Sequence, residues 1–277
     1  MTVVSLMRRA RPSGIPAPGT GSVALVTGAS SGVGRELARL LCERGHDIVL
    51  VARRRERLEE LADELRERFV GRRVEVVPCD LSDPLARESL VNHVNALGLN
   101  VDTLALAAGF GIGGPFTAHD PERTQLMVRT NLEGVIALTG AFAPGMERRR
   151  SGAILIVSSI TGNQPMPNMA AYAATKAAVT SFAESLHEEL RSSKIAVTVL
   201  CPGPINTEFV DVAAMGHTAR RTRFFFSEPK DVARAGIHAL EQRRRTFVPG
   251  IVARVLHAVG GHAPRLLWLP FCRRLMA

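Results

Sequence analysis

Two residues in the middle of the chain have types and a spacing that suit proton transfer. Tyr172 and Lys176 are four residues apart in an alanine-rich segment, so on a helix they share one face. A phenol has an unperturbed pKa of about 10, and a nearby ammonium or oxidised nicotinamide stabilises the phenolate and lowers that pKa. We therefore predict that Tyr172 takes and gives a proton near neutral pH. Considered alone, the motif could also be a chance surface pair.

Two serines follow an apolar run shortly before this helix. Ser159 lies 13 residues before Tyr172, and Ser158 is its neighbour. The carboxyl end of a strand is where α/β proteins build their sites. A serine hydroxyl placed there can hydrogen-bond a substrate oxygen and stabilise the charge that develops on it. The pattern alone leaves both serines open.

A glycine-rich segment near the start of the chain favours binding of a phosphate group. Residues 27–34 read T-G-A-S-S-G-V-G and follow an apolar run. Glycines let the backbone turn tightly and come close to a ligand. A helix that begins after such a turn directs free N–H groups and its positive dipole end at an anion. The segment predicts a pyrophosphate-binding turn, and the alternative is a tight strand-to-helix turn without a ligand.

The residues after the second apolar run favour one nucleotide. Ala52-Arg53-Arg54 stands where an NAD site usually has an Asp or Glu that binds the ribose hydroxyls. Two guanidinium groups can pair with a 2′-phosphate, and no carboxylate is there to repel it. We therefore predict NADP(H) rather than NAD(H), with Arg53 and Arg54 as its ligands. An ordinary charged helix start is the alternative.

Together these motifs resemble the short-chain dehydrogenase/reductase family, over about residues 22 to 250. The family's cofactor turn is T-G-x-x-x-G-x-G, and its catalytic Ser precedes Tyr-x-x-x-Lys by the spacing found here. The resemblance implies hydride transfer between NADP(H) and the carbon of an alcohol or ketone. It implies Ser159, rather than Ser158, as the partner of the substrate oxygen. It also implies that Lys176 binds the nicotinamide ribose and that Asn131 positions a water linking Lys176 to solvent.

The resemblance assigns the other cofactor contacts as well. Asp80-Leu81 borders the adenine, and the loop after the sixth apolar run lies along the nicotinamide. Ala108-Gly109 keeps only half of the family's N-N-A-G motif, whose asparagines often stabilise the central sheet. The predicted catalytic set is Asn131, Ser159, Tyr172 and Lys176. The predicted cofactor set is Gly28, Ser30, Ser31, Gly32, Val33, Gly34, Arg53, Arg54, Asp80, Leu81, Ala108, Gly109, Asn131, Tyr172, Lys176, Pro202, Gly203, Ile205 and Thr207.

Alternating short apolar runs and amphipathic segments must position these residues. This alternation predicts a single-domain α/β Rossmann fold, a doubly wound parallel sheet of about seven strands flanked by helices. Helical spacing or start signals are expected to give helices at residues 32–44, 54–69, 121–143, 170–190 and 229–242, with another beginning at Pro84. Strands are expected at residues 23–27, 48–51, 74–77, 101–107, 153–158, 195–200 and 246–248.

Length and composition fit one such domain. The chain has 277 residues, of which 46% are hydrophobic. Its four cysteines lack metal-site spacing, so we predict reduced thiols, no bound metal and a cytoplasmic protein. Residues 1–21 contain no long apolar run and are expected to form a flexible leader. Residues 22–250 form the catalytic domain and residues 251–277 a C-terminal extension.

The net charge of +9 is concentrated near the end of the chain. Residues 243–277 contain seven arginines and no Asp, Glu or Lys. The arginines alternate with apolar residues, which suits peripheral contact with a membrane surface or an oligomer contact better than nucleic acid. An extension that folds onto its own domain is the alternative. The resemblance implies a homodimer or homotetramer that forms through the helices bearing Asn131 and Tyr172.

The sequence indicates the class of reaction more clearly than it indicates the substrate. Residues 209–227 are expected to form a lid, because they follow the nicotinamide loop. Nearby residues of the expected mouth are apolar and favour an apolar carbonyl or alcohol, although they could equally be local packing. A nucleotide-binding regulator without turnover and a membrane-surface protein are the other functions considered. The expected mouth comprises Phe110, Ile112, Pro165, Met166 and Met169.

Overall fold

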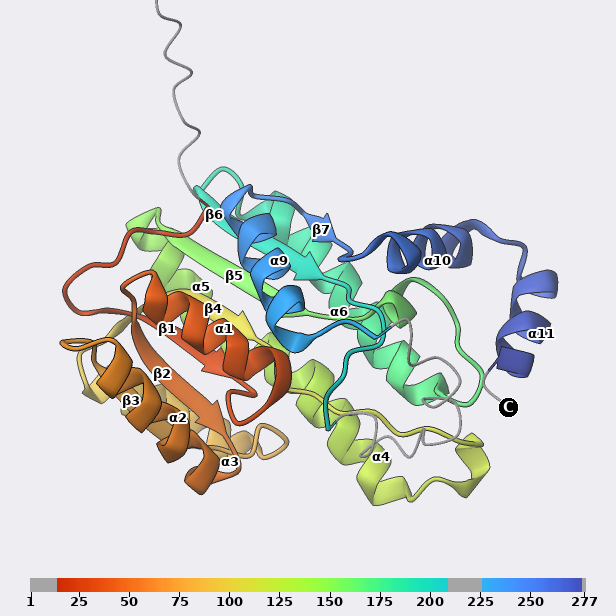
Figure 1. Ribbon diagram of the computed structural model, residues 1–277, viewed down its shortest axis with the longest axis horizontal. Coiled ribbons are helices and arrows are strands. Elements are labelled where there is room, and N and C mark those ends of the chain that lie inside the picture. The colour runs from red at the N-terminus through yellow and green to blue at the C-terminus, as the bar shows by residue number, and fades with distance from the viewer. Residues whose placement is uncertain (1–13, 209–225, 276–277) are drawn as a thin grey trace, which may run out of the picture.

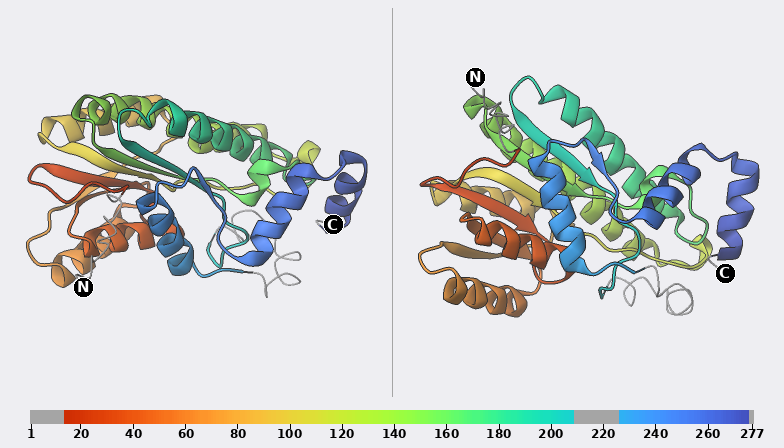
Figure 2. Two further views of the ribbon diagram at one scale, coloured as in Figure 1. Left: turned by 90° about the horizontal axis from the view of Figure 1, so that it is seen from above. Right: turned by 45° about the horizontal axis from the view of Figure 1, so that its top comes forward.

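The computed structural model describes residues 14–208 and 226–275, and it confirms the Rossmann fold. All strand pairs of its seven-stranded sheet are parallel. Helices cover both faces, so the molecule has three layers (Figures 1 and 2). The spatial order of the strands is β3 (Val74–Pro78), β2 (Asp47–Ala52), β1 (Ser22–Thr27), β4 (Asn100–Leu106), β5 (Gly152–Val157), β6 (Ile195–Leu200) and β7 (Thr246–Phe247).

Two apolar cores hold the layers together. One face of the sheet carries α1 (Gly32–Glu43), α2 (Arg55–Arg68) and α9 (Pro229–Glu241). The other face carries α3 (Pro84–Ala96), α5 (Gly134–Arg149) and α6 (Ala170–Glu189). Successive residues of a strand point to opposite faces, so in β1 Leu25 packs in one core and Val26 in the other. Burial on both faces explains why the strands are nearly continuous apolar runs.

The strand order reverses between β1 and β4, and a crevice for ligands is expected outside their carboxyl ends. Figure 1 shows that the strand arrows point to the end of the molecule where α4 (Pro121–Val128) lies. The single helix expected over residues 121–143 is interrupted by a π turn, Arg129–Glu133, before α5 continues to Arg149. Such π turns occur often at functional sites, and this one contains Asn131.

Both ends of the described chain are more ordered than the flexible leader and the C-terminal extension expected from the sequence. Residues 14–21 do not form a free leader, because the Gly14 N–H donates to the Glu241 carbonyl at 2.8 Å and Ile15 is buried. Residues 251–275 form two helices, α10 (Ile251–His262) and α11 (Arg265–Leu275), beyond the carboxyl ends of the strands (Figure 1). Neither these nor the other described helices have both the length and the hydropathy needed to cross a membrane.

Candidate active site

The structure brings the predicted serine and tyrosine together. Ser159 begins the short 3₁₀ helix η3 (Ile160–Asn163) at the end of β5, and its hydroxyl is a hydrogen-bond partner of the Tyr172 phenol. The Ser159 oxygen also accepts the Thr161 N–H at 3.2 Å, which fixes the serine rotamer. The Ser158 hydroxyl points to a later part of α6, where it donates to the Lys176 carbonyl at 3.1 Å. The Ser158 hydroxyl thus holds α6 rather than facing Tyr172.

The buried setting of Tyr172 controls its acidity. Burial raises the pKa of the phenol, and the hydrogen bond with Ser159 opposes that rise. We expected Lys176 to produce a net lowering of this pKa, but desolvation of the phenolate is the larger effect in this structure. The phenol therefore stands protonated at neutral pH, as a proton donor to a carbonyl oxygen requires.

Lys176 lies beneath the phenol, one helical turn further along α6. Its Nζ is 5.8 Å from the centroid of the Tyr172 ring and donates to the Val157 carbonyl at 2.9 Å. Burial lowers the pKa of the Lys176 ammonium to about 8, and the nearby Cys201 thiol slightly opposes this. The site therefore holds a positive charge at neutral pH that is lost under mildly alkaline conditions.

Asn131 is held against the backbone that follows β4. Its Oδ1 accepts the Phe110 N–H at 3.1 Å, and its Nδ2 donates to the Phe110 carbonyl at 2.9 Å. Nδ2 also contacts the Thr175 hydroxyl on α6 at 3.3 Å. A Cβ added to Gly109 would lie 2.9 Å from the Asn131 Oδ1 and 3.5 Å from the Lys176 Nζ. Both polar atoms thus approach Gly109, and Asn131 joins the π turn to the strand end and to α6.

The glycine-rich turn occupies the predicted place between β1 and α1. Gly28 has φ +70°, and a Cβ there would lie 2.9 Å from the Ala108 Cα, so only glycine fits. Gly32 has φ +54°, and a Cβ there would lie 3.1 Å from the methyl group of Thr207. The N-cap of α1, Ser31, makes no side-chain capping bond, and no acidic residue lies in the first turn. The helix start is therefore suited to an external anion.

The remaining residues of this turn pack beneath it. Val33 and Ser30 are buried, and a Cβ at Gly34 would lie 2.3 Å from the Gly28 carbonyl oxygen. Glycine at position 34 thus allows α1 to pack closely on the turn. The Thr27 hydroxyl accepts the N–H groups of Ala107 and Ala108 at 3.1 and 3.2 Å. This pair of bonds ties the ends of β1 and β4 together where the family's asparagines are missing.

The two arginines after β2 have different surroundings. Arg54 donates to the Ser30 hydroxyl at 3.2 Å and forms an ion pair with Glu208 at 2.8 Å. Arg57 also pairs with Glu208. Arg53 is exposed and forms no hydrogen bond or ion pair with another described residue. Arg54 therefore joins the glycine turn to the end of the described Thr207–Glu208 segment.

The residues predicted to border the adenine and the nicotinamide also lie at the carboxyl ends of the strands. One Asp80 oxygen accepts the Ser82 N–H and hydroxyl at 2.9 and 2.7 Å, and Leu81 is buried. The Pro202 carbonyl accepts the Ile160 N–H at 3.0 Å, which fixes the loop after β6 beside Ser159. Further along that loop, Ile205 forms an isolated bridge with Ser227 and Thr207 reaches over Gly32. Gly203, which follows Pro202, lies next to α10, where a Cβ added to it would stand 3.2 Å from the Ala253 Cβ.

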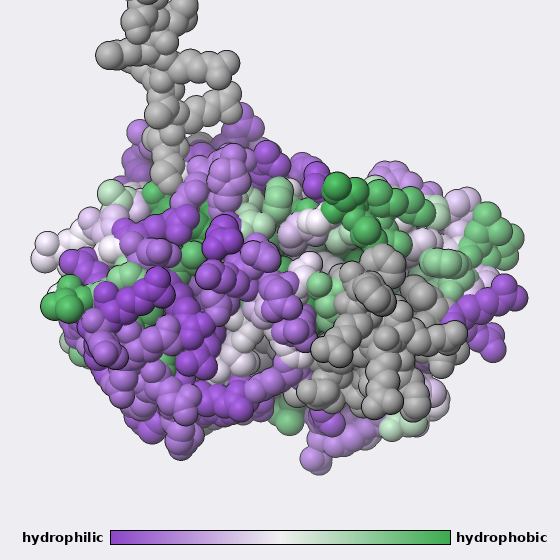
Figure 3. All heavy atoms as spheres, viewed as in Figure 1, coloured by the Kyte–Doolittle hydropathy of each residue, from purple (hydrophilic) through white to green (hydrophobic). Residues whose placement is uncertain are grey.

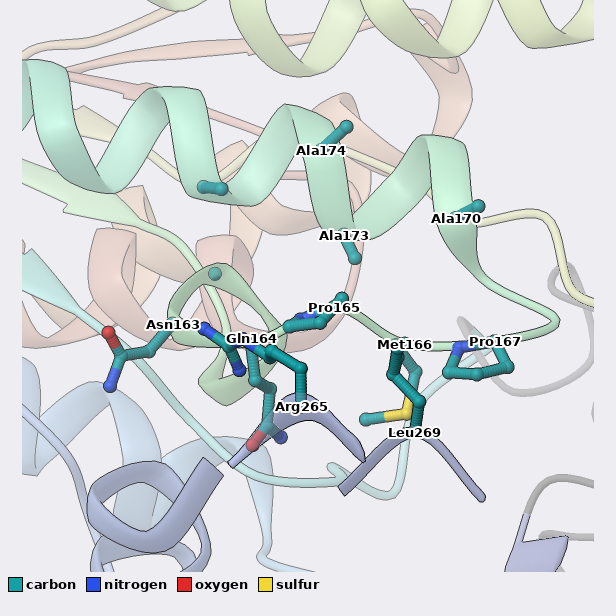
Figure 4. Close-up of a pocket in the computed structure, with 12 residues that line it drawn as sticks. Asn163, Gln164, Pro165, Met166, Pro167, Ala170, Ala173, Ala174, Arg265 and Leu269 are labelled. Carbon is teal, nitrogen blue, oxygen red and sulfur yellow. The ribbon is translucent and has the colours of Figure 1, made fainter. Parts of the chain in front are cut away.

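Apolar side chains surround Tyr172. Ile112, Met127 and Met169 are buried in one cluster with it, and Phe110 and Met166 pack against that cluster. An open groove with a volume of about 590 Å³ lies nearby, on the α6 face that carries Ala170, Ala173, Ala174 and Ala177. Figure 4 shows Ala173 pointing toward the segment that includes Gln164 and Pro165, with Arg265 and Leu269 of α11 on the other side. The expected lid falls almost entirely on residues 209–225, outside the described residues.

Sequence reasoning missed several contributors to this region. Thr27 was expected only as part of the glycine motif, although its hydroxyl joins two strands. The partnership of Glu208 with Arg54 links residues 154 positions apart and has no local signal. The electrostatic interaction of Cys201 with Lys176 and the hydrogen bond between Asn131 and Thr175 likewise depend on the packing of distant elements.

Comparison with known proteins identifies the family. The chain matches the family described as short chain dehydrogenase over residues 22–215. It is 31% identical over 235 residues to an uncharacterised oxidoreductase of Staphylococcus aureus. The alignment covers 85% of this chain and 97% of that relative.

Solved structures give the same result. A short-chain dehydrogenase from Sphingobium yanoikuyae in complex with NADPH has a TM-score of 0.76 at 31% identity, covering 84% of this chain and 90% of that one. L-Sorbose reductase from Gluconobacter frateurii, complexed with NADPH and L-sorbose, has a TM-score of 0.73 at 27% identity, covering 86% and 97%. The chain belongs to the short-chain dehydrogenase/reductase family of oxidoreductases.

Proposed function

We propose that this oxidoreductase interconverts a carbonyl group and a secondary alcohol with NADP(H), using Tyr172 as general acid and base. The observation that carries the proposal is the hydrogen bond between Ser159 and the buried Tyr172 phenol, with the Lys176 ammonium 5.8 Å from the ring centroid. A positioned acid beside a hydroxyl donor is the arrangement needed to bind and protonate a carbonyl oxygen. Ser159, Tyr172, Lys176 and Asn131 form the proposed catalytic set.

The glycine-rich turn fits a dinucleotide. Gly28 approaches the backbone that follows β4 so closely that no side chain is possible there, and the N-cap of α1, Ser31, makes no side-chain capping bond. The turn and the start of α1 would hold the pyrophosphate. Arg53 and Arg54 would hold a 2′-phosphate, and the NADPH bound in both similar structures supports this preference. Asp80, Leu81, Ala108 and Gly109 would border the adenosine side.

The loop after β6 would hold the other end of the cofactor. Pro202, Gly203, Ile205 and Thr207 would lie along the nicotinamide, and Lys176 would bind the adjoining ribose hydroxyls. When bound, the reduced nicotinamide supplies the hydride.

The chain's own residues do the remaining work. The Ser159 hydroxyl binds the carbonyl oxygen and stabilises the negative charge that develops on it. Tyr172 donates its phenolic proton to that oxygen, and the resulting phenolate is stabilised by Ser159 and by the Lys176 ammonium. Asn131 fixes the backbone at Phe110 and, through Thr175, the position of α6. In the oxidation direction the same groups act in reverse, with Tyr172 as base.

The surroundings of Tyr172 favour a substrate with an apolar group next to the reacting carbon. Phe110, Ile112, Met166 and Met169 belong to or pack against the cluster around the phenol. Burial of apolar substrate surface against these side chains contributes about 25 cal/mol per Å². We therefore propose an apolar ketone or secondary alcohol as the substrate class.

A screen of carbonyls and alcohols with NADPH or NADP⁺ tests the function, run with Tyr172→Phe beside the wild type. Turnover is measured by the change in NADPH absorbance. We expect the variant to lose about 100-fold or more in kcat, because the ring remains but the transferable proton does not. NADPH affinity, measured by fluorescence titration, should stay close to that of the wild type. Equal turnover by both proteins would contradict the role of Tyr172, and cofactor binding without turnover of any substrate would favour a regulator.

We also propose a homodimer formed through α5 and α6. Ile136 on α5 is 44% exposed, and a Cβ at Gly140 would have nothing within 4 Å. On α6 the outward face carries Ala174, Ala177 and Ala178. Small exposed residues allow two copies of this pair to pack closely across a twofold axis. Velocity sedimentation at micromolar concentration should show a dimer, and Ile136→Asp should shift it toward monomer.

A further inference from the structure

The two C-terminal helices, called here the C-terminal helix pair (α10 and α11), expose an unusual amount of apolar surface. Leu266 and Leu267 are 84% and 69% exposed, and Ile251 is 74% exposed. Single exposed apolar residues are ordinary on proteins, but a contiguous group marks an interaction site. Figure 3 shows apolar surface gathered over α10 and part of α11. The exposed apolar residues of the pair are Ile251, Val252, Val255, Val259, Leu266, Leu267, Leu269 and Phe271.

Helical geometry places the α10 residues on one side. Ile251, Val255 and Val259 recur at intervals of four, and Val252 lies beside them, so they form one apolar stripe. On α11 Trp268 and Cys272 are buried, again four residues apart. The opposite side of α11 thus presents Leu266 and Leu267 to solvent.

The positive charges of the pair are not neutralised by carboxylates in the part of the chain that the structure describes. Arg254, Arg265, Arg273 and Arg274 are all exposed, and none forms an ion pair with a described residue. Residues 243–277 contain no Asp, Glu or Lys. Arginines that alternate with exposed leucines therefore give the pair a surface that is both apolar and cationic.

This surface is fixed on the catalytic domain. The Asn163 side chain donates to the His257 carbonyl at 2.9 Å, and Arg265 donates to the Gly260 carbonyl at 2.8 Å. Gly260 lies against Gln164 so closely that a Cβ would stand 1.3 Å from the Gln164 Oε1. Because these contacts attach α10 to η3 and α11 to α10, the exposed side chains are held in place before any partner arrives.

We propose that the C-terminal helix pair binds the surface of an anionic lipid bilayer. Basic and apolar side chains on one surface match an interface where anionic headgroups lie above hydrocarbon. The helices have 12 and 11 residues, whereas crossing a bilayer takes about 20, so the pair lies on the surface. A second copy is a poorer occupant, because a twofold contact would set the arginines of one pair against those of the other. Nucleic acid would leave the apolar stripe exposed.

Flotation of the full chain with lipid vesicles tests the proposal. We expect it to float with vesicles of phosphatidylcholine and phosphatidylglycerol in equal parts, and to bind vesicles of phosphatidylcholine alone far more weakly. Raising the salt concentration should weaken the binding, since the attraction is partly electrostatic. The double variant Arg273→Gln/Arg274→Gln should reduce partitioning by about 30-fold, given the usual contribution of an arginine near an anionic surface.

Variants in which exposed apolar residues are replaced, together with a matched control, distinguish binding through this surface from nonspecific hydrophobic adsorption. Leu266→Gln/Leu267→Gln should also lower partitioning, whereas Val70→Gln/Leu85→Gln should not, although Val70 and Leu85 are 88% and 72% exposed. All of these variants should keep the wild-type unfolding temperature, because the side chains are exposed. Failure of the wild type to float with anionic vesicles would overturn the proposal. The proposal would also be overturned if no variant changed vesicle binding while Leu266→Gln/Leu267→Gln dissociated an oligomer of the wild type.

Discussion

At the scale of single residues, two adjacent serines take opposite tasks because of backbone geometry. Ser159 is extended, with φ −162° and ψ 159°, and neighbouring residues of an extended chain point to opposite sides. Ser158 therefore meets the Lys176 carbonyl and the Thr180 hydroxyl, whereas Ser159 meets the Tyr172 phenol nearer the start of the same helix, α6. The residue types alone could not separate the two serines, and the choice of Ser159 came from the family's spacing. The structure now supplies a physical reason for it.

We predict that alanine substitution affects these serines differently. Ser159→Ala should lower kcat by about 100-fold or more, because one donor to the developing oxyanion is lost, and should cost about 0.5–2 kcal/mol of stability, because Ser159 is the N-cap of η3. Ser158→Ala should lower the free energy of unfolding by about 0.5–1.5 kcal/mol, because it removes buried hydrogen bonds to the Lys176 carbonyl and to the Thr180 hydroxyl 2.7 Å away. Steady-state kinetics and urea unfolding of both variants check this. A larger kcat loss in Ser158→Ala than in Ser159→Ala would contradict the assignment.

Lys176 should make cofactor binding depend on pH. Its pKa is lowered to about 8, so the ammonium is present below that pH and is lost as the pH rises through it. If the ammonium holds the ribose hydroxyls, the dissociation constant of NADPH should increase above about pH 8. Fluorescence titration across this range measures the change. Lys176→Met should bind NADPH more weakly and show no inflection there, and an unchanged inflection would assign it to another group.

At the scale of elements, strands and sheet order followed from the sequence, whereas two helical features did not. Apolar runs bounded by glycines located all seven strands because both faces of a parallel sheet are buried. The π turn at Arg129–Glu133 contains no glycine or proline that would mark an interruption, so a single helix was expected. The C-terminal helices contain Gly260, Gly261 and Pro270, which are poor helix formers, and they depend on tertiary packing: α10 packs on η3, and Trp268 of α11 packs against Gly260.

The site shows the same division between local motif and tertiary contact. The glycine turn and the Tyr172–Lys176 pair are each contained within a few residues, so their placement could be predicted. Glu208 could not be, because it meets Arg54 only when the loops after β2 and β6 converge at the carboxyl edge of the sheet.

We predict that Glu208 competes with the cofactor for Arg54. Glu208→Gln should lower KM for NADPH, because Arg54 and Arg57 are then free to bind the 2′-phosphate. Arg54→Gln should raise KM for NADPH by about 10-fold or more while changing KM for NADH little. Arg55→Gln is the matched control, since Arg55 pairs only with Glu59 on the outer side of α2 among the described residues. Equal effects of Arg54→Gln on both cofactors would contradict a role in binding the 2′-phosphate.

At the scale of the whole molecule, the two edges of the sheet have different tasks. The carboxyl edge carries the polar groups of the candidate site. At the amino edge His46 is 1% exposed, and its Nδ1 is 3.9 Å from an oxygen of the buried Asp102. Burial lowers the pKa of His46 and raises the pKa of Asp102, because desolvation disfavours the charged form of each group relative to water. This edge therefore bears on stability rather than on the reaction.

We predict that His46 makes the fold sensitive to mild acid. Above its unfolded pKa of about 6.5, His46 is neutral in both states and adds no pH dependence. As the pH falls below that value, the unfolded chain takes up a proton that the folded chain refuses, so the free energy of unfolding decreases. Urea unfolding between about pH 7 and pH 5 should show a smaller decrease in His46→Gln than in the wild type. His262→Gln, in which an exposed histidine is replaced, should keep the wild-type decrease. An identical decrease in all three proteins would place the acid sensitivity at another group, such as His257, whose pKa is also lowered by burial.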